Sequence, residues 1–369
     1  MNRRPSKSRS GYDAFSSWRS DDFRAASPDA AFFDEKKTPH PGRRTALILF
    51  FALVMLLAVN LIVNQFVFPV RVSIPVKGLD EVFEGFTILQ ISDLKGALFG
   101  KDQRRIRRVL QDEAFDVILL TGDMVSALGN AQPLYSLVEM LRALAPQTPL
   151  YFIPGDDDPA PVSMEHASGG SPVAPWVLGV QQRGAQQLTA PVSFTRGGQR
   201  VWLTASTQLT LDVDAMQAQY EQQYLQALSS GDENAIELAS SFLRQFDSLR
   251  AARKEIADED IIIGAAHTPP TENDLRAYAG KLDVLLCGHT LGGLIRLPFA
   301  GALFIPSRDL PRYGLLPGPK AGSGLSDTRN PRVYTSSGLG STDRHYPSFF
   351  FRLFNPPTVS LISLSPSTM

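Results

Sequence analysis

The apolar residues of this chain concentrate in five short continuous runs, and each run ends in residues of a kind that binds metals. The runs read TILQISDLK (87–95), VILLTGDMV (117–125), LYFIPGDDD (150–158), IIIGAAHTPP (261–270) and VLLCGHTLGG (284–293). Unbroken stretches of Val, Ile and Leu of this length are typical of strands buried on both faces. The pattern therefore predicts five buried strands.

The polar residues at the ends of these runs are candidates for one common site. The carboxyl ends of strands in an α/β sheet converge on one edge, where ligands bind. Five residues that are distant in sequence are therefore expected to meet: Asp93, Asp123, Asp156, His267 and His289. The chain has five histidines, and two of them lie at these strand ends. Carboxylates and imidazoles in this combination indicate a divalent-metal site.

Helical patterns separate the predicted strands. Residues 101–115 and 132–146 carry apolar side chains at helical spacing, so strands and helices alternate as in a layered α/β fold. Between 212 and 257 the pattern changes to two long helical stretches, which predict an inserted helical hairpin. Its apolar stripe is expected to pack on the domain; the functional alternatives are a lid over the site and a surface that lies on a bilayer.

The last third of the chain reads differently. Residues 298–331 are dense in Pro and Gly, which predicts a long irregular loop. Two later segments, YTSSGLG (334–340) and PTVSLISL (357–364), are expected to form the final strands.

An uncharged stretch near the N-terminus decides the expected topology. Residues 45–68 carry no charge over 24 positions, and about 20 apolar residues suffice to span a bilayer. The stretch is longer than the apolar region of a cleaved signal peptide and lacks the polar face of a core helix, so an uncleaved signal anchor is favoured. Lys36, Lys37, Arg43 and Arg44 precede it closely, which places the N-terminus in the cytoplasm and the main domain outside.

These observations divide the chain into four parts. Residues 1–44 are expected to be a disordered cytoplasmic tail, 45–68 a transmembrane signal anchor, 69–77 a linker and 78–369 the main domain. The net charge of −1 excludes a strongly basic nucleic-acid-binding protein. The single cysteine, Cys287, lies within an apolar run and is expected to be a buried thiol.

The five strand-end motifs, in this order and spacing, resemble the calcineurin-like metallophosphoesterase family, and most closely its membrane-anchored bacterial branch. CGHTLGGLIRLPFAGALFIPS (287–307), YTSSGLG (334–340) and NPPTVSLISL (355–364) resemble the end of that branch's domain. The resemblance covers roughly 78–365. It implies a four-layer α/β/β/α sandwich with the helical hairpin as an insertion, preceded here by one transmembrane helix.

The resemblance also implies roles for individual residues. Asp93 matches the first-motif Asp, Asp123 the metal-bridging Asp, His267 the single His of the fourth motif and His289 the first His of the fifth motif. Four positions depart from the family: Lys95 and Leu291 stand where two metal-ligating histidines belong, Asp156 replaces a ligating Asn, and Asp157 replaces the His that protonates the leaving group.

The departures concentrate on one of the family's two metal ions. Two of the four ligands of the first ion are missing, and a lysine repels a cation where an imidazole should face it. The second ion keeps four competent ligands, Asp123, Asp156, His267 and His289. The chain is therefore expected to bind one divalent ion, which could be Mn²⁺, Fe²⁺ or Zn²⁺.

Two functions remain open at this stage. In the first, the protein hydrolyses a phosphoester or pyrophosphate, and analogy with the branch extends this to lipid-linked substrates. Lys95 then stabilises charge on the phosphate and Asp157 is the general acid. In the second, the domain is an inactive relative in which Lys95 pairs with Asp93 and Asp123. It then binds a phosphate or lipid headgroup, or acts as a scaffold in the cell envelope.

Overall fold

The computed structural model describes residues 41–126, 128–163, 171–297, 301–305, 314–318, 322–341 and 352–367. The chain divides at Leu53 into two compact units, and the fold described below is that of the second unit, Val54–Met369. The expected disordered tail, 1–44, falls largely outside the described residues.

Helix α1 spans Pro41–Val63, and its Gly42–Val63 part is long and apolar enough to cross a membrane. The predicted anchor, 45–68, extends past the end of this helix. Its last residues form a short connection, and strand β1 begins at Phe68. The charge-free stretch in the sequence therefore includes most of the helix and the start of the folded domain. Residues 69–77, predicted as a linker, instead form nearly all of β1, which pairs with β15 along its length.

Two six-stranded sheets form the centre of the domain. The first sheet has the order β1 (Phe68–Lys77), β15 (Thr358–Ser367), β2 (Thr87–Ile91), β3 (Val117–Thr121), β4 (Leu150–Ile153) and β5 (Gln186–Gln187). The second has the order β13 (Gly324–Leu325), β14 (Arg332–Thr335), β9 (Val284–Cys287), β8 (Ile261–Ala265), β7 (Gln199–Ala205) and β6 (Val192–Arg196).

All five predicted strands are confirmed, but they are divided between the two sheets. The runs at 87–95, 117–125 and 150–158 become β2, β3 and β4, which pair in parallel in the first sheet. The runs at 261–270 and 284–293 become β8 and β9, which pair in parallel in the second sheet. The strand ends therefore meet across two sheet edges rather than along one.

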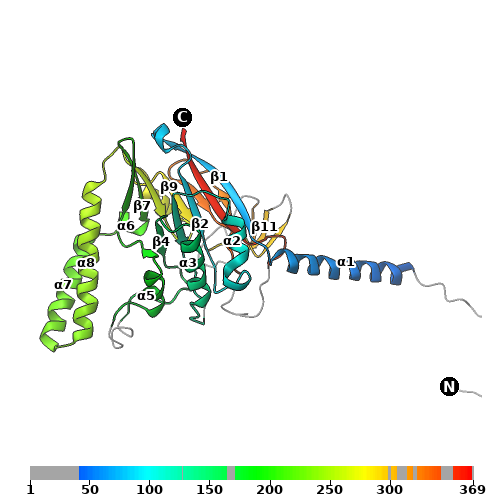
Figure 1. Cartoon of the computed structure of the whole chain (residues 1–369), viewed down its shortest axis with the longest axis horizontal. Helices are drawn as coiled ribbons and strands as arrows, with labels where there is room; N and C mark the ends of the chain where they lie inside the picture. The colour runs from blue at the N-terminus through cyan, green and yellow to red at the C-terminus, as the bar shows by residue number, and fades with distance from the viewer. Residues whose placement is uncertain are drawn as a thin grey trace, which may run out of the picture. The chain divides into compact units, whose positions relative to one another are not determined.

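The helices complete the outer layers. They are η2 (Glu81–Phe83), η3 (Lys101–Gln103), α2 (Arg104–Leu110), α3 (Gln132–Leu144), α5 (Pro175–Gln182), α6 (Thr207–Thr210), α7 (Val213–Ser230), α8 (Glu233–Glu255) and α9 (Glu272–Tyr278). Figure 1 shows α2 and α3 beside the strands of the first sheet.

Alternation of side chains along the strands produces the layers. On β3, Leu119 packs between the two sheets with Leu203 of β7 and Leu286 of β9. Its neighbour Leu120 points to the other face, where α2, α3 and α5 cover the first sheet. On the second sheet, Leu285 packs with α6 and α9 in the same way. The α/β/β/α arrangement implied by the resemblance is thus confirmed.

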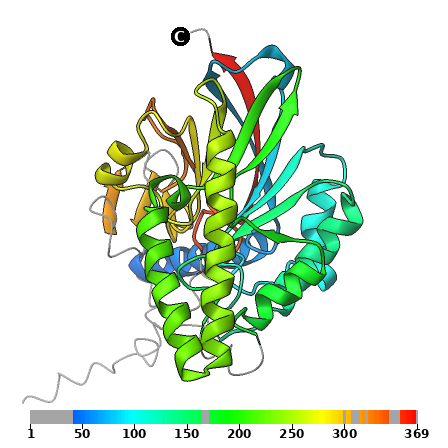
Figure 2. The same ribbon diagram turned by 90° about the vertical axis from the view of Figure 1, so that its left-hand side faces the viewer.

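The predicted helical hairpin is also present as α7 and α8, which run side by side in both views (Figures 1 and 2). Asp212 and Asp232 cap the two helices by accepting hydrogen bonds from backbone amides, and Gly231 adopts the left-handed conformation that ends α7. Phe246 and Leu249 are buried at its base. At the far end, Leu225 is 65% exposed.

The long irregular loop predicted over 298–331 is wrong in part. Strands β10 (Ile295–Leu297), β11 (Gly301–Ile305) and β12 (Gly314–Gly318) form a small antiparallel sheet, and β13 begins at Gly324. Glycine here bounds short strands, with register shifts in both pairings, rather than preventing strands altogether. Residues 298–300, 306–313 and 319–321 lie outside the described residues.

Replacing Leu119 by Ala tests the core between the sheets. Leu119 is fully buried, so the substitution should lower the free energy of unfolding by about 2–5 kcal/mol through lost burial and a cavity. Urea denaturation of the detergent-solubilised chain measures this. The control is Leu225→Ala at the exposed tip of the hairpin, and equal effects of the two substitutions would contradict the assigned core.

Candidate metal centre

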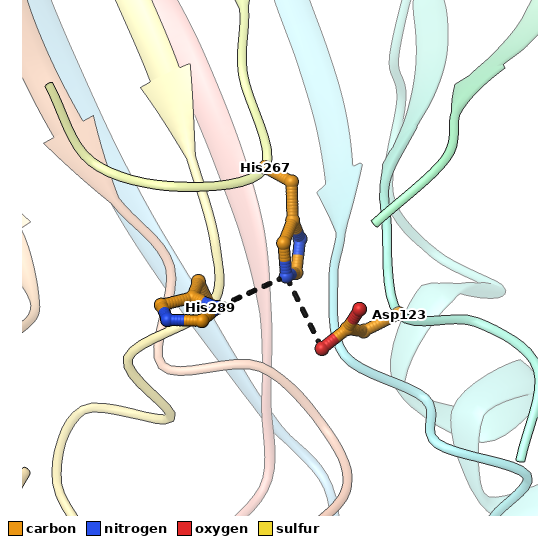
Figure 3. Close-up of side chains that lie close together, drawn as sticks. All are labelled: Asp123, His267 and His289. Atoms are coloured by element: carbon orange, nitrogen blue, oxygen red, sulfur yellow. Dashed lines mark hydrogen bonds and ion pairs between the residues drawn. The ribbon is translucent and has the colours of Figure 1, made fainter. Parts of the chain in front are cut away.

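Three of the predicted site residues meet where strands of both sheets end. Asp123 follows β3, His267 follows β8 and His289 follows β9, and their side chains point toward one another (Figure 3). Asp123 Oδ2 lies 3.1 Å from His267 Nε2, and His267 Nε2 lies 3.2 Å from His289 Nδ1. Among the described residues these three form a group that could hold a metal ion.

The spacing of these donors suits one ion. Two ligand atoms that each lie about 2.0–2.1 Å from a tetrahedral ion are separated by roughly 3.3 Å. The distances of 3.1 and 3.2 Å are close to this value. One carboxylate and two imidazoles are also the donor types that Zn²⁺, Mn²⁺ and Fe²⁺ accept.

The orientation of His267 is fixed by its other ring nitrogen. His267 Nδ1 lies 2.8 Å from the carbonyl oxygen of Thr121, so the Nδ1–H donates there and Nε2 faces Asp123. This is the outer-shell contact that usually orients a metal-ligating histidine. Burial disfavours the charged imidazole, but the hydrogen bond to Asp123 and the charges of Asp93 and Asp123 outweigh it and raise the pKa of His267 to about 9.

His289 is held through its backbone. Its amide donates to Asp93 Oδ2 at 3.0 Å. Burial, together with the charge of His267, lowers the pKa of His289. A cation on one imidazole therefore disfavours a cation on the other.

Asp156, the predicted fourth ligand, lies at the solvent side of this group. Its Oδ2 is 3.5 Å from His289 Nδ1 and accepts a hydrogen bond from the Thr268 hydroxyl at 3.0 Å. Its side chain is 61% exposed. Asp156 is thus near the group but is not part of the three-residue cluster, and a rotation of this exposed side chain would be needed to join it.

Lys95 occupies the opposite side of Asp123. Its Nζ donates to Asp123 Oδ2 at 2.6 Å and to Asp157 Oδ2 at 2.9 Å, and its side chain is almost completely buried. Burial alone would lower the pKa of Lys95, but the charges of Asp123, Asp93 and Asp157 outweigh burial and raise it. In the same way, the contacts of Asp123 with His267 and Lys95 outweigh its burial and hold its pKa well below the ordinary range.

Asp93, which matches the first-motif aspartate, and Leu291, in the fifth motif, are both buried. Asp93 is fully buried, and its Oδ2 accepts hydrogen bonds from the Ser92 hydroxyl and the His289 amide. Its Oδ1 is buried without a hydrogen-bond partner in the described part of the chain. Leu291 is buried, and its carbonyl accepts hydrogen bonds from Arg352 and Asn355.

The backbone at the site is strained at the motif positions. Asp93, Lys95, Asp123, His289 and Leu291 all have φ between 48° and 72°, a region that residues other than glycine rarely adopt. Such conformations cost of order 1–3 kcal/mol each and cluster at functional sites. A Cβ on Gly155 would lie 2.2 Å from the amide nitrogen of Asp123, so only glycine allows the second and third motifs to pack this closely.

Two residues at the site were given no role in the predictions made from the sequence. Asp158 accepts hydrogen bonds from the amides of Val125 and Gly155, at 2.7 and 2.8 Å, and so joins the loops that follow β3 and β4. Its position as the third aspartate in GDDD was the available signal. Arg352 donates from a fully buried guanidinium to five backbone carbonyls around the fifth motif, and burial lowers its pKa to about 10. No local pattern in the sequence marks it.

Comparisons with known proteins agree with this geometry. The profile of the family described as calcineurin-like phosphoesterase matches residues 86–293. The uncharacterized metallophosphoesterase YkuE of Bacillus subtilis (strain 168) is 25% identical over 264 residues, which cover 70% of this chain and 74% of that protein.

Two further proteins match less completely. Phosphodiesterase YaeI of Escherichia coli (strain K12) is 32% identical over 99 residues, which cover 27% of this chain and 30% of that protein. The crystal structure of the phosphopantetheinyl hydrolase PptH from Mycobacterium tuberculosis aligns with 78% of this chain and 98% of that one, at 10% identity and a TM-score of 0.34, a likeness too low to support any inference.

The family profile spans more than half of the chain and includes all five strand-end motifs. Among the described residues, Asp123, His267 and His289 form a group that could hold a metal ion. The chain belongs to the calcineurin-like phosphoesterase family.

Proposed function

We propose that the protein is a membrane-anchored phosphoesterase that uses one divalent ion and one lysine in place of two ions. The observation that carries this proposal is the environment of a single oxygen atom. Asp123 Oδ2 contacts Lys95 Nζ at 2.6 Å and His267 Nε2 at 3.1 Å. Of the two positions beside this carboxylate that two metal ions would occupy, one thus holds the amine of Lys95. The other is lined by imidazoles.

The ion is assigned to Asp123, His267 and His289, with Asp156 as the fourth ligand. When bound, a divalent ion there supplies Lewis-acid stabilisation of charge on a phosphoryl oxygen. The Nδ1–H bond of His267 to Thr121 keeps the Nε2 lone pair directed at the site once that nitrogen has lost its proton. Ion binding therefore has to displace a proton from His267.

Lys95 is assigned to phosphate binding. An ammonium group has three donors, and two of them are used in the hydrogen bonds to Asp123 and Asp157. The third remains for a phosphoryl oxygen, where a buried positive charge stabilises developing negative charge. The paired carboxylates keep Lys95 protonated.

Asp157 is assigned to protonation of the leaving group, for which its carboxylate, paired with Lys95 in this structure, must first take up a proton. Its amide donates to Asp123 Oδ1 at 2.8 Å and its Oδ2 bonds Lys95, so the residue is held against both charged groups of the site. By the resemblance, Asp157 stands at the position of the histidine that protonates the leaving group in the family. Asp93 is assigned a positioning role, since its Oδ2 accepts a hydrogen bond from the backbone amide of His289.

A cavity next to the candidate metal centre supports a substrate with an apolar substituent. The cavity has a volume of about 780 Å³ and is lined by Asp156, His267 and His289 at one end. At the other end its wall comes from the helical hairpin, including Met216, Tyr220, Phe242 and Phe246. Pockets of this size and character hold drug-sized organic groups. This favours a phosphoester or pyrophosphate attached to an apolar group, including a lipid-linked one.

The proposed location follows from α1 and the charges before it. The helix is long and apolar enough to cross a membrane once, by length and composition. The basic residues that precede the apolar stretch support a cytoplasmic N-terminus and an extracytoplasmic main domain. Nucleic acid is not proposed as a partner, because the chain has a net charge of −1.

A second candidate function is supported by the same ion pairs. Lys95 pairs with both Asp123 and Asp157, so these carboxylates are partly compensated without any bound ion. In this alternative the domain binds a phosphate or lipid headgroup, or serves as an envelope scaffold, without hydrolysis.

Hydrolysis separates the two candidates. The detergent-solubilised chain with Mn²⁺ should hydrolyse a phosphomonoester, phosphodiester or pyrophosphate, and a chelator should abolish the activity. His289→Ala should lower the rate by about 10²-fold or more, because it removes one of the imidazole ligands. Arg276→Ala, on the exposed face of α9, is the control. An ion-loaded protein that turns over none of these substrates would favour the binding function.

Lys95→Met tests the internal cation. The substitution leaves the buried Asp123 beside the half-buried Asp157 without their partner, which should destabilise the ion-free protein by about 3–5 kcal/mol. Added Mn²⁺ should restore more stability to this variant than to the native chain, since a cation can then fill the vacated position. Thermal unfolding with and without Mn²⁺ measures both effects. Lys77→Met, at an exposed position on β1, is the control and should change little; an equal response would contradict the assignment.

Restoring the family residues tests whether the first ion was lost through side chains alone. Lys95 and Leu291 keep the left-handed backbone found at the other motif positions. Lys95→His with Leu291→His should therefore allow a second ion to bind. Adding Asp157→His should raise phosphodiester hydrolysis by about 10²-fold or more, given what one acid and one metal contribute. If the native chain proves the faster catalyst, Lys95 and Asp157 are adapted catalytic groups and the inactive alternative fails.

A further inference from the structure

The end of helix α1 is joined to the domain by buried polar contacts. Asn60 and Asn64, both nearly inaccessible, donate from their side-chain amides to the carbonyl of Arg352 at 2.7 and 2.6 Å. The amide of Phe354 donates in return to Asn60 Oδ1 at 3.0 Å. Two asparagines that interrupt an otherwise apolar stretch thus have a structural partner in the segment 352–355.

The same segment reaches the candidate metal centre. The buried guanidinium of Arg352 donates to the carbonyls of Gly340 and Leu291, each at 2.8 Å. Gly340 in turn donates to the carbonyl of Asp93 at 2.6 Å. The final turn of α1, Arg352 and the Asp93 loop therefore form one continuous hydrogen-bonded structure, and the metal-site edge of the domain is the edge nearest to the end of the helix.

Exposed apolar side chains lie beside this end of the helix and on segments that pack in sequence from it. Leu98 lines a small cavity together with Asn64 and Arg352, and Leu128 lies in a turn whose Ser126 contacts Gly96. Phe354 follows the segment that pairs with β10, and β12 carries Leu315 and Leu316 in the same small sheet. We call the following residues, which are between 40% and 82% exposed, the apolar rim: Phe66, Leu98, Leu128, Leu315, Leu316 and Phe354.

The remaining surface of the described domain exposes few large apolar side chains. Three more exposed apolar residues, Phe68, Leu297 and Phe304, lie on strands next to the rim. Away from it, the described residues after Val63 expose large apolar side chains only at Val82, Leu225 and Leu228. The hairpin that carries the two leucines and the small sheet that contains β11 lie on opposite sides of the domain (Figure 1). Contiguous exposed apolar residues mark interaction surfaces.

Positive charge borders the rim. Helix α2 and the turn before it carry Lys101, Arg104, Arg105, Arg107 and Arg108, four of them exposed. Arg105 bonds the carbonyl of Gln65 at 2.9 Å and lies 5.9 Å above the ring of Phe66, so this basic group starts directly beside the end of α1. Apolar side chains bordered by Lys and Arg are the composition of surfaces that lie on anionic bilayers.

We propose that the apolar rim and the exposed basic residues of α2 form a surface that rests in the headgroup layer of an anionic bilayer. The occupant is taken to be lipid because the rim is continuous with the end of the membrane-spanning helix, an argument that rests on the membrane anchoring in the proposed function. The hydrogen bonds through Arg352 then hold the metal-site edge of the domain against the membrane.

Quenching by lipid tests this surface on the full chain. Cys287 is fully buried, so a fluorescent thiol reagent should react only with introduced cysteines. Single variants Leu128→Cys, Leu316→Cys, Leu225→Cys and Leu57→Cys are labelled, reconstituted in phosphatidylglycerol–phosphatidylcholine vesicles, and exposed to a quencher carried on lipid. Leu225, at the hairpin tip, is the matched control, and Leu57, within α1, reports whether the helix is in the bilayer.

Labels at 128 and 316 should be quenched to within about twofold of the label at 57, and the label at 225 should be quenched far less. Quenching at 57 combined with equal values at 128, 316 and 225 would overturn the proposal while leaving the anchor intact. Lack of quenching at 57 would overturn both the anchor and the surface, and hydrolysis measured on the same samples reports on catalysis separately.

The exposed basic residues of α2 provide a second test of the proposed surface. Replacing Arg104, Arg107 and Arg108 by Gln should reduce quenching at 128 in anionic vesicles but not in neutral ones. The control makes the same change of charge elsewhere on the domain, at the exposed Lys254, Arg276 and Lys281. If the control triple reduces quenching as much as the α2 triple, the effect is one of net charge, and the role assigned to α2 is wrong.

Discussion

The ion pair between Lys95 and Asp123 is the interaction on which the candidate site depends. Asp123 is buried at the end of β3, with Asp93 and Asp157 close enough to influence the same lysine. Several carboxylates in one buried region repel each other unless cations compensate them. In a two-ion phosphoesterase the metals provide that compensation. In the proposed function the amine of Lys95 provides part of this compensation, and the ion bound by Asp123, His267 and His289 provides the rest.

The surrounding backbone adopts strained conformations and hydrogen bonds that keep Lys95 and Asp123 in contact. Asp93, Lys95 and Asp123 all have positive φ, and the Lys95 amide donates to the Asp123 carbonyl at 2.8 Å. Asp158 fixes the loop after β4 to the loop after β3. Leu291 keeps the strained conformation of its motif although its side chain cannot bind a metal. Lys95 and Leu291, which the resemblance places at metal-ligating positions, thus share the left-handed backbone of Asp93, Asp123 and His289, and this supports the proposal of a working site rather than a collapsed one.

Much of this arrangement could be predicted from the sequence, because unbroken apolar runs and their polar ends are local signals. They identified the strands, the hairpin and the meeting of Asp123, His267 and His289. The division of these strands between two sheets was not visible, since parallel strands look alike in either sheet. The predicted pairing of Lys95 with Asp93 and Asp123 was partly wrong. Lys95 donates to Asp157 as well as to Asp123, whereas Asp93 accepts hydrogen bonds from Ser92 and His289. Side-chain pairing depends on distances across loops that no pattern encodes.

Arg352 illustrates the limit most clearly. Its guanidinium contacts carbonyls between Leu291 and Asn355, and its own carbonyl contacts Asn60, nearly 300 positions earlier in the chain. A buried arginine that bonds only backbone carbonyls carries no spacing or charge pattern that could be read beforehand. Similarly, glycine-rich residues after 298 conceal β11 and β12, because short strands between turns have too few apolar positions to show alternation.

Anomalous X-ray scattering from crystals of the native chain grown with Mn²⁺ tests the central claim most directly. The account predicts one strong peak among Asp123 Oδ2, His267 Nε2 and His289 Nδ1, with Lys95 Nζ still hydrogen-bonded to Asp123 and Asp157 on the other side. A second peak of similar strength beside Asp93, with Lys95 displaced, would contradict the claim that an amine has taken the place of an ion.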